Sequence, residues 1–311
     1  MTDKIQDLII VGGGPSALAA AIYTAREDID TTIYEKAAVG GIVATIDNID
    51  NYPGFPDGVE GMTLAEQWEK QAKRFGAKIE FGEVSAISVD GDIKTLTIDG
   101  NPVKAKSVLI ATGRSYSKIG APGEAEYFGR GVHYCATCDG AFYTNKRLIV
   151  VGGANSAVQE AIYLTRFATH IDLIVRSTIK ASEILKRDLQ KFVDEGRITI
   201  YLGTTIDEVV GINGHVTSIK ATQNGQPMTL DTDGIFVFVG MKPNTWFLKD
   251  SPVELDEEGF VIADKTLHTN VPGIFASGDV RAGATMQIAS AVGDGVTAAI
   301  CIREYLHKLG K

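Results

Sequence analysis

The fold is decided by residues 8–17, which read LIIVGGGPSA. The wholly apolar run at residues 8–11 predicts a short strand that is buried on both faces, and the glycines end it. A helical pattern rich in alanine follows at residues 16–26, and a second strand is expected at residues 31–34, ending at Glu35. A strand, a helix and a strand in this order predict a parallel sheet.

The glycines of this stretch also have the spacing of a nucleotide-binding turn. Gly12 allows the tight turn after the strand, Gly14 lets the backbone approach a pyrophosphate, and the small Ala17 packs the helix against the strand. The helix N-terminus supplies free N–H groups and the positive end of the helix dipole. Glu35 is placed to accept a ribose hydroxyl. We therefore expect a dinucleotide site at this turn.

The same order of elements recurs in the second half of the chain. An apolar run at residues 148–151 leads into Gly152 and Gly153, a helical pattern follows at residues 156–167, and a strand is expected at residues 171–175. Such a recurrence indicates a duplicated structural unit rather than a short-period repeat.

Each half continues with strand-like pieces and closes with an apolar strand that ends in glycine, at residues 108–113 and 235–240. Tight hairpins are predicted between the strand pieces, because four dipeptides there readily adopt the positive φ angles that such turns need. These dipeptides are Asp90-Gly91, Asp99-Gly100, Asn213-Gly214 and Asn224-Gly225.

The end of the chain has no nucleotide fingerprint of its own. It contains a strand-like stretch at residues 274–279 and a helix expected from about residue 286 to 309. We expect this tail to return to the first domain, which then comprises residues 1–115 and 245–311. Residues 116–244 form the second domain. The predicted fold class is α/β, with two Rossmann-like domains of the three-layer ββα type and the second inserted into the first.

The second fingerprint, residues 152–157, differs from the first in ways that bear on its ligand. Ala154 stands where a glycine normally permits the approach of a phosphate, and its methyl group narrows the site without closing it. The following strand ends in Arg176 rather than an acid. A cation there, with Lys180 nearby, suits the 2′-phosphate of NADP. The alternative is that both cations are solvated charges on a remnant domain. The candidate residues for NADP are Gly152, Asn155, Ser156, Arg176 and Lys180.

Two cysteines, Cys135 and Cys138, lie between the fingerprints and are followed at once by Asp139. A catalytic redox pair needs a reactive thiolate, a close partner thiol and a proton donor, and Asp139 is placed to be that donor. A zinc site needs four ligands, and a structural disulfide is disfavoured in the cytosol, so redox catalysis is the preferred interpretation. Cys301 is expected in the core. His133 either assists proton transfer or only makes a structural hydrogen bond.

Composition limits the class of function further. The chain has 311 residues, enough for two domains, and its net charge of −9 argues against nucleic acid as a partner. No apolar run is long enough to span a bilayer, and the start shows no secretory signal pattern. Three cysteines do not make a secreted disulfide framework, so we expect a cytoplasmic protein with no membrane partner.

Taken together, these motifs resemble those of the low-molecular-weight thioredoxin reductases, and the resemblance covers the whole chain. The segments that carry it are residues 12–15, Gly40-Gly41, residues 51–56, residues 111–113, residues 135–139 and residues 278–280 with Gln287.

The resemblance implies that the first domain binds FAD and that the inserted domain binds NADPH. The implied FAD residues are Gly12, Gly14, Pro15, Ser16, Glu35, Lys36, Gly41, Asn51, Val84, Ala111, Thr112, Gly113, Asp279, Gln287 and Ile288. It also implies a homodimer, a rotation of the inserted domain about its two linkers, and a thioredoxin-like protein as the partner. By the same resemblance Cys138 faces the flavin and Cys135 attacks the substrate disulfide.

The chain departs from the family pattern on the nicotinamide side. Ala154 interrupts the fingerprint, the cation-rich segment after the strand is shorter, Met286 replaces an arginine before Gln287, and Ile42 replaces a common glutamine. NADPH is the expected donor. The alternatives are the same disulfide chemistry fed by reduced ferredoxin or a reduced deazaflavin, a dithiol oxidase, and a flavin-binding sensor.

Overall fold

The computed structural model describes residues 5–46 and 48–310 of the chain. These divide into two compact units: unit 1 is Met1–Ser115 with Lys242–Lys311, and unit 2 is Tyr116–Met241. The second unit is therefore inserted into the first. The boundary predicted at residue 245 lies just beyond the observed return at Lys242.

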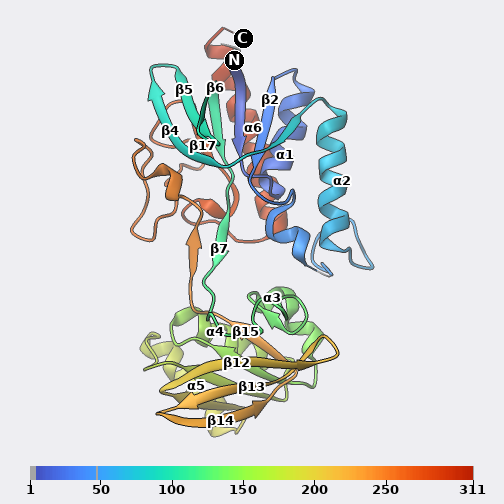
Figure 1. Ribbon diagram of the computed structural model, residues 1–311, viewed down its shortest axis with the longest axis vertical. Coiled ribbons are helices and arrows are strands. Elements are labelled where there is room, and N and C mark those ends of the chain that lie inside the picture. Colours follow the sequence, from blue (N-terminus) through green and yellow to red (C-terminus); the bar gives the residue numbers. More distant parts are fainter. Residues whose placement is uncertain (1–4, 47, 311) are drawn as a thin grey trace. The chain divides into compact units, whose positions relative to one another are not determined.

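Unit 1 is built on a seven-stranded sheet with the strand order β3-β2-β1-β6-β5-β4, to which β17 adds beside β6 (Figure 1). The strands next to β1 are parallel to it, as the strand–helix–strand pattern predicts. The strands are β1 Gln6–Val11, β2 Thr31–Glu35, β3 Lys78–Phe81, β4 Val84–Asp90, β5 Ile93–Ile98, β6 Asn101–Ile110 and β17 Ile274–Ala276. The helices are α1 Pro15–Arg26, α2 Gly61–Arg74 and α6 Ile288–Lys308, with short 3₁₀ turns η1 Gly41–Thr45, η3 Trp246–Leu248 and η4 Gly278–Val280.

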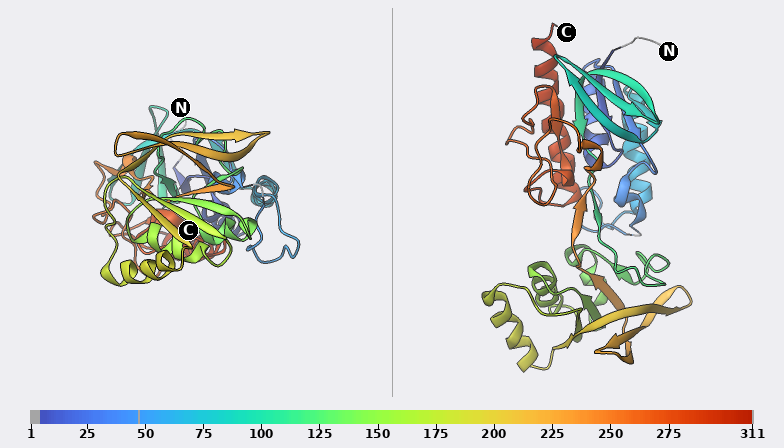
Figure 2. Two further views of the ribbon diagram at one scale, coloured as in Figure 1. Left: turned by 90° about the horizontal axis from the view of Figure 1, so that it is seen from below. Right: turned by 60° about the vertical axis from the view of Figure 1, so that its left-hand side comes forward.

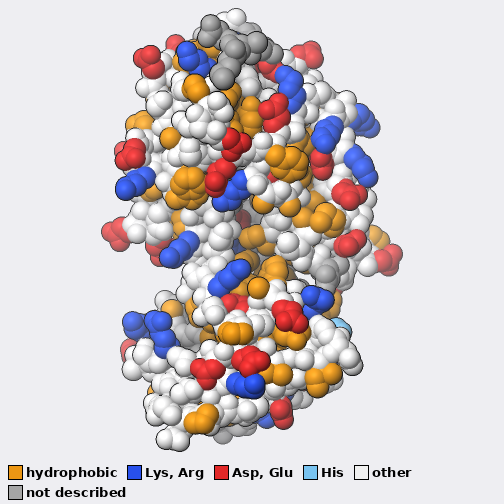
Figure 3. All heavy atoms as spheres, in the orientation of Figure 1, with side chains coloured by type: hydrophobic (Ala, Val, Ile, Leu, Met, Phe, Trp, Pro, Cys, Tyr) orange, Lys and Arg blue, Asp and Glu red, His pale blue; other side chains and the backbone are white. Residues whose placement is uncertain are grey.

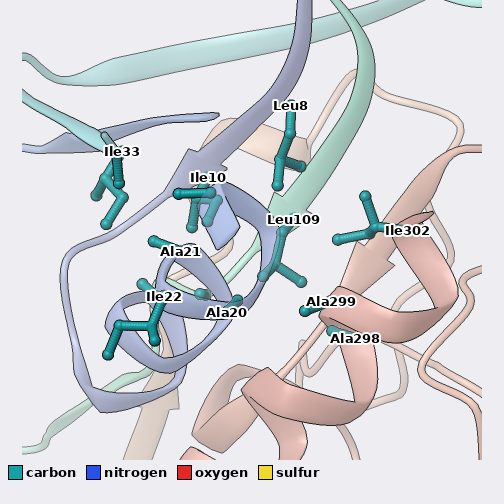
Figure 4. Close-up of a cluster of buried hydrophobic side chains, with 14 of the residues drawn as sticks. Leu8, Ile10, Ala20, Ala21, Ile22, Ile33, Leu109, Ala298, Ala299 and Ile302 are labelled. Carbon is teal, nitrogen blue, oxygen red and sulfur yellow. The ribbon is translucent and has the colours of Figure 1, made fainter. Parts of the chain in front are cut away.

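Alternate residues of β1 face opposite sides of this sheet, because side chains along a strand alternate. Leu8 and Ile10 pack with α1 and α6, and the small residues of these helices let them approach the sheet closely (Figure 4). Ile9 and Val11 face the other side and pack with residues of β4, β5 and β17. Both faces are covered, which explains why the strand reads as a continuous apolar run.

The long strand β6 pairs with its neighbours in both the antiparallel and the parallel sense. Its first half pairs antiparallel with β5, while its second half runs parallel to β1 and β17. The hairpins of both units show the predicted positive φ angles at the asparagine or aspartate of three dipeptides: Asp99, Asn213 and Asn224. At the fourth, Gly91 has a positive φ angle whereas Asp90 is still in β4 and pairs with Ile93.

Unit 2 repeats the plan with a five-stranded parallel sheet in the order β11-β10-β9-β15-β8 and a separate three-stranded sheet, β12-β13-β14. Leu148 and Val150 of β9 pack with the helices, and Ile149 and Val151 pack with the three-stranded sheet. Figure 2 shows these layers. The strands are β8 Val132–His133, β9 Arg147–Val151, β10 His170–Val175, β11 Ile198–Leu202, β12 Thr204–Ile212, β13 His215–Gln223, β14 Gln226–Asp231 and β15 Gly234–Val237. The helical segments are α3 Ala136–Asp139, η2 Gly140–Tyr143, α4 Asn155–Leu164 and α5 Glu183–Asp194.

The chain passes between the units along two paired strands, β7 Arg114–Tyr116 and β16 Met241–Pro243. The predicted fold class, with two Rossmann-type units, is confirmed.

Two helix ends differ from the prediction. Helix α4 ends at Leu164 and not at residue 167, because the Thr165 hydroxyl bonds back to the Ile162 carbonyl oxygen at 2.6 Å and competes with further helix. Helix α6 begins at Ile288, since Met286 has a φ of 61° and Gln287 is extended.

Among the described residues, no helix is long and apolar enough to cross a membrane. Those residues also bring together no cluster of three or more metal-ligating side chains. On the face drawn in Figure 3, acidic and basic side chains are interspersed over both units.

Candidate active site

The first fingerprint connects β1 to α1, and the physical reason for having a glycine differs between its positions. Gly12 has a φ of +98°, and a Cβ atom there would lie 2.6 Å from the Ala111 carbonyl oxygen. Gly14 has an ordinary extended conformation, and a Cβ atom on it would meet nothing within 4 Å. Gly12 is thus required by the turn itself, whereas Gly14 leaves open space at the start of the helix. Pro15 occupies the first helical turn, where its missing N–H costs nothing.

Glu35 holds the fingerprint from the end of β2. Its carboxylate accepts hydrogen bonds from the Gly13 amide at 2.7 Å and from the Ala37 amide at 2.8 Å. A carboxylate has about four acceptor positions, so these two bonds leave room for a ribose hydroxyl. The neighbouring Lys36 is exposed and pairs with Glu83 at 3.4 Å.

Distant segments come together around this turn. The Ala111 carbonyl and Thr112 lie against Gly12, and a Cβ atom on Gly41 would lie 3.7 Å from the Gly14 Cα. The buried Ser16 hydroxyl donates to the Ser277 hydroxyl at 2.6 Å, which ties α1 to the residues just before η4. Five of the predicted FAD segments therefore meet at one end of the sheet. They are residues 12–16, Glu35, Gly41, residues 111–113 and the start of η4.

Asp279 in η4 forms an ion pair with Arg114, with its Oδ2 atom 3.1 Å from the Arg114 Nε atom. Burial raises the pKa of Asp279, and the nearby Arg114 guanidinium works against that rise. The η4 turn is held by Asp294 of α6, whose carboxylate accepts a hydrogen bond from the Gly278 amide at 3.1 Å and two from the Arg281 side chain.

The remaining FAD candidates fall into two groups. Asn51 donates to Gln287 at 3.4 Å, so these two residues, far apart in sequence, lie together, and Ile288 packs beside the small cluster around η1. Val84 is different, because its side chain is buried in the core under the sheet with Tyr34 and Ile98.

The residues of unit 1 fit a dinucleotide such as FAD. The space over Gly14 is open, and the first turn of α1 has neither a side-chain cap nor an acidic residue. Backbone N–H groups at such a helix start favour a pyrophosphate.

The second fingerprint reproduces the backbone of the first. Gly152 has a φ of +140°, and the Lys180 amide donates to the Gly153 carbonyl at 2.7 Å, just as the Gly40 amide donates to the Gly13 carbonyl at 2.8 Å. The loop 176–180 therefore lies against the fingerprint. Ala154 is extended and exposed at the position that corresponds to Gly14.

The NADP candidates line this turn and its loop. Ser156, Arg176 and Lys180 are exposed, and the Asn155 side chain accepts from the Ser182 amide at 2.9 Å. Asn155 thus fixes the start of α5 to the start of α4. The arrangement fits a nucleotide phosphate next to two cations, with the Ala154 methyl group at its edge.

Cys135 and Cys138 are joined in a disulfide at the start of α3. Both are half-buried, and the exposed Thr137 lies between them with its hydroxyl oxygen 3.4 Å from the Cys135 sulfur. The pair is thus partly exposed to solvent. In contrast, Cys301 packs against the core beside α1, and burial raises the pKa of its thiol. The thiol of Cys301 therefore belongs to the core, as predicted.

The carboxylate of Asp139 faces the interior of unit 2. Its Oδ2 atom lies 3.2 Å from the Nδ1 atom of His133, and the Nε2 atom of His133 lies 2.7 Å from the Tyr143 hydroxyl. Sequence reasoning left the role of His133 open and missed Tyr143. It also missed Arg114, although Arg114 directly follows the Ala111-Thr112-Gly113 motif and that position was a usable signal.

Two Rossmann-type units, one with a nucleotide cradle and the other with an accessible disulfide beside a carboxylate, define a nucleotide-dependent disulfide oxidoreductase. A model of the pyridine nucleotide-disulphide oxidoreductase family matches residues 6–295. The thioredoxin reductase of Listeria innocua is 40% identical over 310 residues, which cover 99% of this chain and 96% of that protein. The thioredoxin reductase of Bacillus subtilis is 37% identical over 310 residues, which again cover 99% of this chain and 96% of that protein.

The crystal structure of the thioredoxin reductase from Streptococcus pyogenes matches with a TM-score of 0.93 and 37% identity, over 99% of this chain and 100% of that one. The chain therefore belongs to the pyridine nucleotide-disulphide oxidoreductase family, and within it to the thioredoxin reductases. The resemblance seen in the sequence is confirmed, and the protein is an enzyme of the oxidoreductase class.

Proposed function

We propose that this enzyme is a flavin-dependent thioredoxin-disulfide reductase that passes electrons from NADPH, through FAD and the Cys135–Cys138 pair, to a thioredoxin-like protein. The observation that carries the proposal is the accessible disulfide beside Asp139, in a unit that also holds the second fingerprint. The names of the relatives support the substrate class. We further propose a cytoplasmic homodimer, which the family resemblance and the close redox pair favour.

The proposed exchange needs only side chains of this chain and the substrate. The Cys135 thiolate attacks one sulfur of the substrate disulfide, the substrate S–S bond breaks, and the leaving thiolate takes up a proton. Cys138 then gives its thiol proton to Asp139 and attacks the Cys135 sulfur. The mixed disulfide breaks, the second substrate sulfur leaves and is protonated, and the enzyme disulfide re-forms. One substrate disulfide is reduced and one enzyme dithiol is oxidised.

The cofactors supply the electrons for the next cycle. FAD held at the first fingerprint, with NADPH at the second, supplies the two-electron chemistry that returns the disulfide to the dithiol. Glu35 and the amides at the start of α1 hold the adenosine and pyrophosphate parts. The paired Asp279 and the Asn51–Gln287 contact orient the remainder of FAD.

The identity of the electron donor has two candidates. NADPH is supported by the hydrogen bond between the Lys180 amide and Gly153, because it holds the loop with Arg176 and Lys180 on the fingerprint. Reduced ferredoxin or a reduced deazaflavin is the second candidate, and Ala154 favours it. Its methyl group occupies the place that Gly14 leaves open in unit 1.

Anaerobic titration of the FAD-loaded protein, followed by flavin absorbance, distinguishes the donors. We expect NADPH to bleach the flavin at lower concentration than NADH. The double variant R176A/K180A should need at least about tenfold more NADPH, since each cation contributes a charge-assisted hydrogen bond, while its response to NADH stays unchanged. Lys220→Ala, an exposed cation on the three-stranded sheet, is the matched control.

Two outcomes would contradict these assignments. If R176A/K180A raises the required concentrations of NADPH and NADH by the same factor, the loop does not bind the 2′-phosphate. Bleaching by reduced ferredoxin, and by neither nucleotide, would establish the second donor.

A further inference from the structure

His133 lies between Asp139 and Tyr143 in one buried row of close polar contacts. The side chain of His133 is 8% exposed and that of Asp139 is 16% exposed, so water competes little for either group. The Nδ1 atom of His133 lies 3.2 Å from the Asp139 carboxylate, and Nε2 lies 2.7 Å from the Tyr143 hydroxyl. The row begins at the residue next to Cys138 and ends in the interior of unit 2.

Packing holds the imidazole ring in one orientation. His133 lies in β8 opposite Phe236 of β15, and the two rings stack with their centroids 5.2 Å apart. The ring of Tyr143 stands edge-on to both. The Tyr143 ring packs directly against Gly234, because a Cβ atom on Gly234 would lie 2.5 Å from that ring. The imidazole ring of His133 therefore has little freedom to turn away from Asp139.

The charges around the row decide which atom carries the proton. Burial raises the pKa of Tyr143, and the carboxylates of Asp139 and Asp233 raise it further, so the phenol keeps its proton. When this phenol donates to the Nε2 atom, the proton of a neutral imidazole is on Nδ1, facing Asp139. Asp233, the other acid near the row, is paired with Lys146 and with the Arg147 amide.

We propose that His133 is a positioning residue for Asp139: it donates its Nδ1–H to the carboxylate, and Tyr143 fixes the tautomer that makes this possible. This inference rests on the proposed role of Asp139 as acceptor of the Cys138 proton. His133 aims the carboxylate, because a side chain that accepts a proton must be within hydrogen-bond reach of it.

The test follows the full-length, FAD-containing protein after reduction by dithiothreitol and anaerobic removal of that reagent. Its dithiol is mixed with Ellman's reagent, and separately with an oxidised bacterial thioredoxin, at one fixed neutral pH. The variants are H133F, which keeps a ring against Phe236, H133N, whose amide can still donate from the Nδ1 position, and Y143F. Tyr163→Phe, which removes a hydroxyl from an edge-on aromatic pair in the same unit, is the control.

We expect H133F to lower the exchange rate about tenfold, the scale of one hydrogen bond to a charged group. H133N should restore most of the rate, Y143F should lower the rate by a smaller factor than H133F, and Tyr163→Phe should match the native enzyme. The double variant H133F/D139N should be no slower than D139N alone, because His133 acts through Asp139.

The proposal is overturned if H133F keeps the native rate, if H133N fails to restore the rate, or if the loss in H133F multiplies with that in D139N. A native enzyme that exchanges with Ellman's reagent but not with thioredoxin would contradict the proposed substrate and would leave the role of His133 testable with the small disulfide.

Discussion

Replacing Gly12 or Gly14 with alanine should have different consequences, although the two glycines lie in one turn. At Gly14 the backbone is extended, with φ −77° and ψ −176°, and a Cβ atom would meet nothing within 4 Å. Ala154 shows nearly the same backbone, φ −90° and ψ 179°, with an alanine in place. Gly14→Ala should therefore change the free energy of unfolding of the FAD-free chain by less than about 1 kcal/mol.

The added methyl group fills the space that lets a phosphate approach the backbone. Loss of one charge-assisted hydrogen bond costs about 1.5–3 kcal/mol, and a hundredfold weaker Kd lies within that range. At a FAD concentration a thousand times the native Kd, bound FAD stabilises the folded chain by about 4 kcal/mol, and a hundredfold loss of affinity leaves about 1.4 kcal/mol. The difference corresponds to a Tm lower by about 5–10 °C.

Gly12→Ala should instead destabilise the chain without any ligand. The positive φ alone costs about 1–3 kcal/mol, and the methyl group would lie 2.6 Å from the Ala111 carbonyl oxygen. Circular dichroism melts of both variants, with and without FAD, separate the two effects. The reasoning is refuted if the FAD-free Gly14→Ala chain melts as early as Gly12→Ala, or if Gly14→Ala melts like the native protein at the stated FAD concentration.

The remaining predictions concern α6 and the ion pair beside it. Gly295→Ala should destabilise the fold by about 1–3 kcal/mol, because its Cβ would lie within 2.1 Å of the Ser16 carbonyl oxygen. Gly293→Ala in the same helix has open space and should stabilise the fold by about 0.5–1 kcal/mol. Urea unfolding that ranks the two variants the other way would contradict the close packing of α1 on α6. Because burial raises the pKa of Asp279, the folded chain binds more protons than the unfolded chain between pH 3.8 and the raised value. The free energy of unfolding should therefore fall as the pH rises through that window. Arg114→Met should extend the window upward, Asp279→Asn should abolish it, and unfolding curves across pH that are the same for all three proteins would exclude this contribution.

Sequence reasoning succeeded where a single local rule acts. The apolar run at residues 8–11, the glycine turn and the terminal Glu35 each follow from backbone geometry or burial, and the same rules found the second copy at residues 148–153. The spacing of Cys135 and Cys138 identified the redox pair, since a disulfide across two residues needs only one helical turn. The helix ends were less predictable, because Thr165 and Met286 stop or delay a helix through one side-chain bond or one φ angle.

The tertiary structure alone decided which distant residues meet. Asp279 and Arg114 are separated by 165 positions and Asn51 and Gln287 by 236, and no local pattern predicts either contact. The row from Asp139 through His133 to Tyr143 depends on β8 lying beside β15 and on the missing side chain of Gly234.

This difference arises from how far apart in the sequence the interacting residues are. Turn conformation and strand burial are set by neighbours in the chain and are therefore written in short stretches of sequence. Side-chain pairing across a sheet or between helices is set by packing, which involves many residues at once and fixes only in the folded protein. The sequence by itself determined the class of fold and the chemistry of its disulfide. The folded chain decided that the Asp139 carboxylate lies beside His133.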